Sequence, residues 1–305
     1  MPDGELVEIA DGVWAWIQPD GTWWVNNAGL IAGGEGDILV DTCASEARTR
    51  ALLAAAAQAR PGARIRYAIN THAHGDHSYG NGFLPPDAVI LGHERMRATL
   101  QADPVIDGCP PFWTPVPDWG AVTRRLPDLV VAESAAIVSG SVRAEVRHPG
   151  YPAHTTGDLV VWMPEERILF AGDLLFSGLT PLVFMGSVVG ARDALDWIAS
   201  FAPRLIVPGH GPVLEGAGIA DEIERHKRYY DVVLAAGRAA LESGATPLEA
   251  ATGLDLGEFA QWPDAERIVL NLHRVVADAH GTELDPIAAF RDAVAYNGGP
   301  MRTSL

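Results

Sequence analysis

The sequence predicts an α/β fold in which two packed β-sheets are covered by helices. Short apolar, β-rich segments gather in two parts of the 305-residue chain, and Ala- and Leu-rich helical segments lie between and after them. Apolar residues make up 48% of the chain and charged residues 20%, an ordinary globular balance that leaves enough material for a core.

The first part alternates strands with a helix. Ser45 can cap a helix whose body is residues 48–59, and Pro61-Gly62 stops that helix before the next strand. Gly and Asp separate the other apolar segments. We expect strands at 13–17, 27–31, 37–40, 65–69 and 88–91, and a second helix at 94–101.

Residues 103–119, DPVIDGCPPFWTPVPDW, are too rich in proline to form a regular element. A long loop inside a compact domain is often a binding lid. With Phe112, Trp113 and Trp119 available for stacking, we favour a lid over a packed surface loop.

The second part repeats the pattern of the first and then becomes helical. We expect one main domain over residues 1–215 and a helical extension over 216–305 that packs on the same domain. The predicted strands are 130–131, 136–138, 142–147, 160–162, 168–170 and 205–207, and the predicted helices are 191–201, 219–243, 247–252, 264–279 and 286–294.

Bulk properties exclude several classes of function. The net charge of −17 opposes binding to nucleic acid, which depends on neutralising phosphates with Lys and Arg. No apolar run is long enough to span a membrane, and the acidic start does not resemble a secretory signal. Cys43 and Cys109 form no metal-binding pair and suit a reduced compartment. We therefore expect a cytoplasmic protein with neither nucleic acid nor membrane as partner.

The strongest local signal is the run from Asn70 to His77, NTHAHGDH, directly after an apolar strand. Because side chains alternate in an extended segment, His72 and His74 share one face and can bind the same ion. Asp76 and His77 follow where the chain turns into a helix, and there they can reach a neighbouring ion.

Three later residues extend this set: His154 in AHTTGD, Asp173 in FAGD and His210 in PGHG. Asp173 and His210 each follow an apolar strand closely, and loops at strand ends are where α/β folds place ligands. Taken singly, each could instead be a capping or core residue.

The run THAHGDH, the later HTTGD, AGD and PGHG, and their order resemble the metallo-β-lactamase superfamily over residues 5–215. The resemblance implies a four-layer αβ/βα sandwich. It also implies one metal on His72, His74 and His154, a second on Asp76, His77 and His210, and Asp173 as the bridge between them. It assigns Asp41 to the support of a histidine ligand and a structural role to Asp158.

The ligand types favour two Zn²⁺ ions, although iron or manganese accepts the same atoms. Two such ions can share a hydroxide that attacks a carbonyl, and we expect Asp76 to align it as the catalytic residue. The resemblance makes a redox enzyme less favoured, because His74 stands where the diiron members carry glutamate.

With aspartate at position 173, the chain resembles glyoxalase II and the lactonases more than the secreted β-lactamases. Residues 179–190, LTPLVFMGSVVG, resemble actinobacterial members, among them cyclase/thioesterases of polyketide pathways. We therefore expect a hydrolase of an ester- or thioester-type acyl substrate, free or on a carrier protein, in a chain that could form a homodimer. A lactonase, a β-lactamase-like enzyme, a phosphodiesterase and a non-catalytic scaffold are the alternatives.

Overall fold

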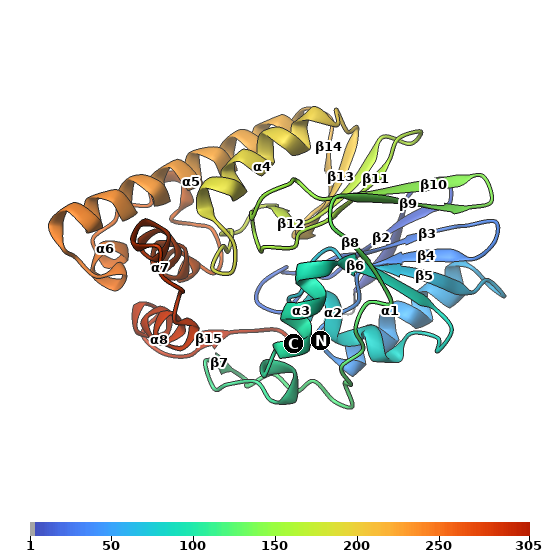
Figure 1. Ribbon diagram of the computed structural model, residues 1–305, viewed down its shortest axis with the longest axis horizontal. Coiled ribbons are helices and arrows are strands. Elements are labelled where there is room, and N and C mark those ends of the chain that lie inside the picture. The colour runs from blue at the N-terminus through green and yellow to red at the C-terminus, as the bar shows by residue number, and fades with distance from the viewer. Residues whose placement is uncertain (1–3) are drawn as a thin grey trace.

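The computed structural model describes residues 4–305 and contains two β-sheets that pack face to face (Figure 1). In the larger sheet, strands β1 to β4 are antiparallel neighbours, and β4, β5, β6 and β8 run parallel. Its strands, in spatial order, are β1 (Glu5–Ala10), β2 (Val13–Ile17), β3 (Ala28–Ile31), β4 (Asp37–Val40), β5 (Ile65–Ile69), β6 (Val89–His93) and β8 (Leu129–Val131).

The second sheet has six strands, and β12 and β13 form its one parallel pair among the described residues. The longer of this pair, β12, is buried along its whole length. In spatial order the strands are β14 (Leu214–Glu215), β13 (Leu205–His210), β12 (Ile168–Phe176), β11 (Val160–Met163), β10 (Val142–Arg147) and β9 (Ser134–Ser139).

Apolar side chains of the two sheets meet in a shared core. Ile38, Val40 and Ile69 from the first sheet pack in one buried cluster with Val161 and Phe170 from the second. Burying such side chains stabilises the fold by about 1.5–3 kcal/mol each. Their strands are largely or wholly buried, as the short apolar, β-rich segments of the sequence indicated.

Helix α1 (Glu46–Ala59) covers the outer face of the first sheet. Its Leu52 and Ala56 are buried against strand residues such as Leu39. The helix begins where expected, since the Ser45 side chain accepts a hydrogen bond from the backbone N–H of Arg48. Helix α3 (Glu94–Ala102) lies beside β6.

Helix α4 (Val188–Ser200) covers the outer face of the second sheet, where Leu195 and Ile198 share a buried cluster with Leu169 and Ile206. The order of layers is therefore helix, sheet, sheet, helix. This arrangement confirms the predicted αβ/βα sandwich.

Helices follow β14, and of these α5 and α7 pack against α4 (Figure 1). The division of the chain at residue 215 stays a prediction. The helices after β14 are α5 (Ala217–Ser243), α6 (Pro247–Thr252), the 3₁₀ turn η3 (Gly257–Phe259), α7 (Arg267–His280) and α8 (Pro286–Tyr296). The shorter helical elements of the first half are α2 (Gly75–Ser78), η1 (Tyr79–Phe83) and η2 (Val105–Asp107).

Several elements differ from expectation. Strand β1 was not predicted, because it carries Glu5 and Glu8 and is largely exposed at the sheet edge. Strand β12 runs six residues beyond the predicted 168–170, since it pairs with β13 as far as Phe176. The C-terminal part also contains a strand, β15 (Met301–Arg302), which pairs with β7 (Trp113–Thr114).

The loop over residues 103–119 is a packed surface loop in this structure. Trp113 and Trp119 are only 3% and 6% exposed, so the expectation that they are free to stack on a substrate is wrong. The Trp119 Nε1–H donates to the backbone carbonyl of Val105, which holds the loop together. Phe112 alone among its aromatic residues is half-buried.

Within residues 4–305, no helix combines the length and the apolar character needed to cross a membrane.

We predict that Gly29→Ala destabilises the fold, because a Cβ at this position in β3 would lie 2.2 Å from Phe170 Cε1. The free energy of unfolding in urea should fall by about 1–3 kcal/mol. Gly218→Ala in α5, where a Cβ meets no atom within 4 Å, is the control and should change it by less than about 1 kcal/mol. Equal values for the two variants would contradict the close packing of the sheets.

Candidate metal centre

The centre lies at one end of the two sheets, where strands of both end in polar loops. His72 and His74 follow β5, and Asp76 and His77 lie in the short helix α2. Hydrogen bonds fix this turn, since the side chains of Thr42 and Asn70 both donate to the backbone carbonyl of His77.

The second sheet supplies the other candidate ligands. Asp173 lies within β12 and His210 ends β13, and these strands are parallel neighbours, so the two side chains meet. A Cβ on Gly209 would lie 1.9 Å from Asp173 Oδ1, so only glycine fits beside this carboxylate. His154 reaches the same place from the loop between β10 and β11.

All seven predicted ligands come together in two groups. In the first group, His74 Nδ1 lies 3.1 Å from His72 Nε2 and 2.9 Å from His154 Nε2. Asp173 Oδ2 lies 3.3 Å from His154 Nε2. The donor atoms of these four residues lie within 4.8 Å of one another.

Asp76, His77 and His210 form the second group, whose donor atoms also lie within 4.8 Å of one another. His210 Nε2 lies 3.2 Å from Asp76 Oδ2. Asp173 touches this group as well, because its Oδ1 lies 3.1 Å from His77 Nε2 and its Oδ2 lies 3.5 Å from His210 Nε2. Asp173 therefore stands between the groups, where a bridging carboxylate is expected.

Partners on the far side of each ring orient the imidazoles. The Nδ1 of His154 lies 2.6 Å from the carbonyl oxygen of Leu182, and that of His210 lies 2.8 Å from the carbonyl oxygen of Gly21. A carbonyl can only accept, so Nδ1 carries a proton, and Nε2, which faces the centre, is the nitrogen that can offer a lone pair to a metal ion. This is the tautomer that a metal ligand needs.

Asp41 supports His77 as the resemblance implied. Its carboxylate accepts hydrogen bonds from the backbone N–H and the hydroxyl of Thr71, each at 2.7 Å, and lies 2.8 Å from His77 Nδ1. Asp41 has a φ of 60°, a left-handed conformation that costs an L-residue roughly 1–2 kcal/mol. Such strain is typical of residues held for function.

Burial favours neutral imidazoles in the first group. Burial is the main cause that lowers the pKa of His72 and His74 below 6.5 and that of His154 to about 3. A neutral imidazole has the free lone pair that binds a cation.

The second group is held by opposite charges. Burial opposes ionisation, but attraction between Asp173 and the imidazoles, His210 foremost, outweighs it and keeps the pKa of Asp173 well below 3.8. Asp76 behaves in the same way, with a pKa of about 2. The carboxylates in turn raise the pKa of His210 to about 9. The carboxylates of Asp76 and Asp173 therefore give the site a negative charge, which either imidazolium groups or bound cations can balance.

The residues fit a dinuclear metal site. His77 Nε2 and Asp173 Oδ1 are buried and lie 3.1 Å apart, yet neither makes a hydrogen bond, and a cation bound to both would satisfy them. The donors are imidazole nitrogens and carboxylate oxygens, a set that zinc, iron and manganese all accept.

Other residues that could take part in chemistry lie outside the two donor groups and support the fold. Asp158 accepts hydrogen bonds from the backbone and hydroxyl of Thr155 and so holds the turn after His154. Tyr229 and Tyr230 are 1% exposed and pack in the core. The remaining histidines, at positions 93, 148, 226, 273 and 280, lie outside both donor groups.

Two contributors were not predicted. Phe184 stacks on His74, with ring centroids 5.4 Å apart and planes 6° apart. Thr71 joins Asp41 to His72, since its hydroxyl also lies 3.0 Å from His72 Nδ1. Phe184 belongs to the segment 179–190, which the family resemblance had singled out for another reason.

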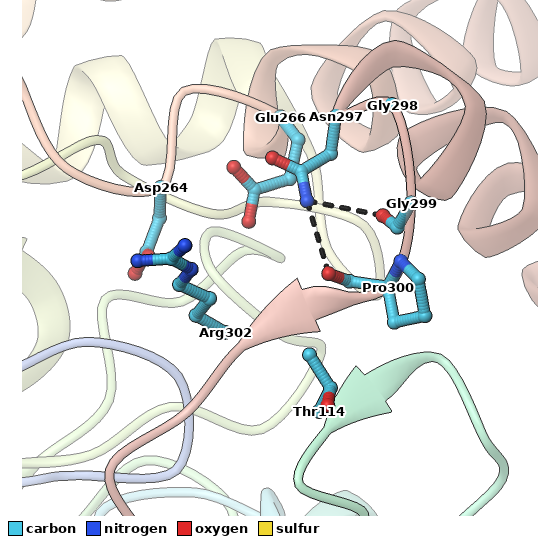
Figure 2. A pocket seen from close by; sticks show the side chains of 8 residues that line it. All are labelled: Thr114, Asp264, Glu266, Asn297, Gly298, Gly299, Pro300 and Arg302. Carbon is cyan, nitrogen blue, oxygen red and sulfur yellow. Dashed lines mark hydrogen bonds between the residues drawn. The ribbon is translucent and has the colours of Figure 1, made fainter.

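A separate cavity of about 530 Å³ lies where the turn before α7 meets the turn after α8 (Figure 2). Its buried acids already have partners: Glu266 accepts from the Trp23 indole, and Asp264 pairs with Arg267 at 2.7 Å. None of the seven candidate ligands lines it. The lining residues are Thr114, Asp264, Glu266, Asn297, Gly298, Gly299, Pro300 and Arg302.

We predict that Asp41→Asn weakens metal binding by about 10–100-fold, because the amide cannot support both His77 and Thr71 as the carboxylate does. Competition with a chromophoric chelator measures this affinity. Asp37→Asn replaces another buried carboxylate, bound instead to Arg60, and should leave the affinity unchanged. Normal affinity in Asp41→Asn would contradict the support of His77.

We also predict a pH effect from His226, which is fully buried in α5. Burial lowers its pKa from 6.5 to about 4. The folded state therefore holds fewer protons than the unfolded state between these values. The stability that His226 contributes is complete above pH 6.5 and is lost as pH falls toward 4, by about 3 kcal/mol.

Replacing His226 by Gln should remove that dependence. The free energy of unfolding is measured in urea on metal-free protein, for wild type and for His226→Gln. The value for wild type minus the value for His226→Gln should be about 3 kcal/mol lower at pH 4 than at pH 7. The exposed His280→Gln is the control. A difference that stays constant with pH would show that His226 does not titrate in this range.

Comparison with known proteins agrees with this geometry. Residues 21–210 match the family model of the metallo-beta-lactamase superfamily. An acyl-coenzyme A thioesterase of Homo sapiens is 26% identical over 222 residues, covering 63% of this chain and 78% of that protein. A hydroxyacylglutathione hydrolase of Rhodospirillum rubrum is 31% identical over 149 residues, which are 48% of each chain.

Solved structures show the same fold. A metallo-beta-lactamase from Pontibacter korlensis superposes with a TM-score of 0.58 at 18% identity, over 74% of this chain and 99% of the other. The family match includes all seven candidate ligands, and the structure brings those seven side chains together. The chain belongs to the metallo-beta-lactamase superfamily.

Proposed function

We propose that this chain is a dinuclear metal-dependent hydrolase that cleaves the carbonyl of a thioester or ester, with zinc as the preferred metal. One observation carries the proposal: seven donor residues converge in two groups that share Asp173. A mononuclear or purely structural site would not need a carboxylate between two sets of ligands.

The metal ions would supply the Lewis acidity that polarises a carbonyl and makes water nucleophilic at neutral pH. The protein's own part is to hold charge and protons in place. The carboxylate of Asp76 is ionised at neutral pH, since its pKa is about 2. It can accept a hydrogen bond from the attacking water and orient it, as we proposed for the catalytic residue.

The ring of Phe184 lies parallel to that of His74, and in this position it would shield one side of the centre from water. Water exclusion strengthens the electrostatic interactions that act on the reacting carbonyl. The backbone carbonyls behind His154 and His210 keep these rings oriented.

Thioesters are favoured as the substrate class because two relatives carry the names acyl-coenzyme A thioesterase and hydroxyacylglutathione hydrolase, both for hydrolysis of an acyl compound. The net charge of −17 disfavours nucleic-acid phosphodiesters. The narrower prediction of a polyketide cyclase/thioesterase with a carrier-bound substrate rests on residues 179–190 and stays a prediction, as do a cytoplasmic location and a homodimer.

A substrate screen tests the proposal. The zinc-loaded protein should hydrolyse acyl thioesters with a kcat/KM at least about tenfold above its values for lactones, β-lactams and bis(p-nitrophenyl) phosphate. Efficient turnover of lactones or β-lactams without thioester cleavage would replace the thioesterase assignment. Efficient cleavage of the phosphodiester alone would overturn carbonyl hydrolysis.

We predict that Asp173→Ala lowers metal content and activity together. Without the shared carboxylate, metal content by mass spectrometry should fall below two ions per chain, and kcat/KM should fall by about 100-fold or more. Asp193→Ala, which removes an exposed acid from α4, should change neither. Two bound ions with full turnover in Asp173→Ala would end the bridging assignment.

A further inference from the structure

A row of aromatic side chains begins at the metal centre. Phe184 stacks on the ligand His74, and Phe290 of α8 meets Phe184 edge-on with centroids 5.5 Å apart. Phe290 in turn stacks on Phe112, at 5.5 Å and 8°, and contacts Trp113 at 5.3 Å.

The row then returns toward the second group of ligands. Trp113 contacts Trp24 at 5.2 Å, and Trp24 precedes Val25, whose carbonyl oxygen lies 3.0 Å from His210 Nδ1. The aromatic row therefore runs from a ligand of the first group to the support of a ligand in the second. We call this set the aromatic arc, and its members are Trp24, Phe112, Trp113, Phe184 and Phe290.

Burial differs along the arc. Trp113 is buried at its centre, but the other four side chains are only half-buried. Aromatic side chains are large, and apolar surface left open beside a polar centre commonly marks a binding site. If the arc served only to attach α8, complete burial of these rings would stabilise the fold more.

Segments far apart in the chain build the arc. They are the loop before β3, the loop containing β7, the loop before α4, and α8. Phe290 lies outside the family match at residues 21–210. The arc is therefore partly an addition of this chain to the shared catalytic region, which is where a difference in substrate would arise.

Ring orientation narrows the kind of ligand. The ring planes of His74 and Phe184 are nearly parallel at 6°, and those of Phe184 and Phe290 are nearly perpendicular at 78°. Farther along the row, the planes of Phe290 and Trp113 are inclined by 61°, and those of Trp113 and Trp24 by 71°. A flexible alkyl chain can follow such a surface of mixed faces and edges by van der Waals contact, whereas a flat, fused ring system has no common plane along the row on which to lie.

We propose that the half-buried rings of the aromatic arc, held in place by the buried Trp113, bind the acyl part of the substrate and make the enzyme selective for long, unbranched alkyl thioesters. This inference rests on the proposed thioester hydrolysis. Each methylene group that the arc removes from water should improve kcat/KM by roughly fourfold, mainly through KM.

The test compares neutral N-acetylcysteamine thioesters of acetic, decanoic and 2-naphthoic acid with zinc-loaded full-length protein. Wild type should favour decanoyl over acetyl by at least about 100-fold in kcat/KM. Phe290→Ala should reduce this selectivity ratio by about tenfold or more, and Phe290→Leu, which keeps an apolar side chain, should restore much of it.

Controls separate binding from folding. Phe201→Leu alters a half-buried ring in a different aromatic cluster, with Trp162 and Trp197, and should keep the wild-type ratio. Metal content of all variants should match wild type, and the assays are run below the unfolding midpoint of the least stable variant, because Phe290→Ala also removes packing. An equal loss of kcat/KM for acetyl and decanoyl in Phe290→Ala would mean that Phe290 only supports the fold.

The outcomes distinguish the two proposals. Acetyl thioester cleavage without preference for decanoyl would overturn the arc while upholding thioester hydrolysis, and preference for naphthoyl would replace the alkyl chain by a flat acyl group. If no thioester is cleaved, the proposed function fails. In that case, the binding of decanoate, monitored by tryptophan fluorescence, tests the arc as a binding site. Weaker binding to Phe290→Ala than to wild type supports the arc, and the lack of binding to wild type overturns it.

Discussion

The structure depends on a single carboxylate, Asp173, that lies buried among imidazoles from both sheets. An isolated buried carboxylate would be strongly destabilising, so its charge has to be balanced by nearby protons or cations. Contacts with His77, His154 and His210 provide that balance and at the same time tie together segments far apart in sequence. The packing of the sheets and the chemistry of the centre thus meet at the same side chain.

The surroundings of Asp173 are correspondingly restricted. Gly209 leaves no room for a side chain, and the parallel pairing of β12 with β13 sets the position of His210 relative to the carboxylate. Behind the ligands, Asp41 in its left-handed conformation and the carbonyls of Leu182 and Gly21 keep the rings from turning. The rigidity of the centre is therefore supplied by the backbone as much as by side chains.

Much of this could be predicted from the sequence, because the local patterns agree with the fold. The apolar, β-rich segments around Ile38 and Ile69 predicted strands, and the run from His72 to His77 predicted a cluster of ligands. The edge strand β1 was missed because Glu5 and Glu8 interrupt its apolar character. The ring of Phe184 on His74, and the inward packing of Trp113 and Trp119, depend on tertiary contacts that no local pattern reports.

The position of Phe290 late in the chain has a consequence for biosynthesis. All seven candidate ligands precede residue 211, whereas the aromatic arc is incomplete until α8 docks. During translation the centre can thus gather its donors before the helix that completes the arc has left the ribosome. The chain therefore completes its set of candidate metal ligands before it completes the surface that we propose selects the substrate.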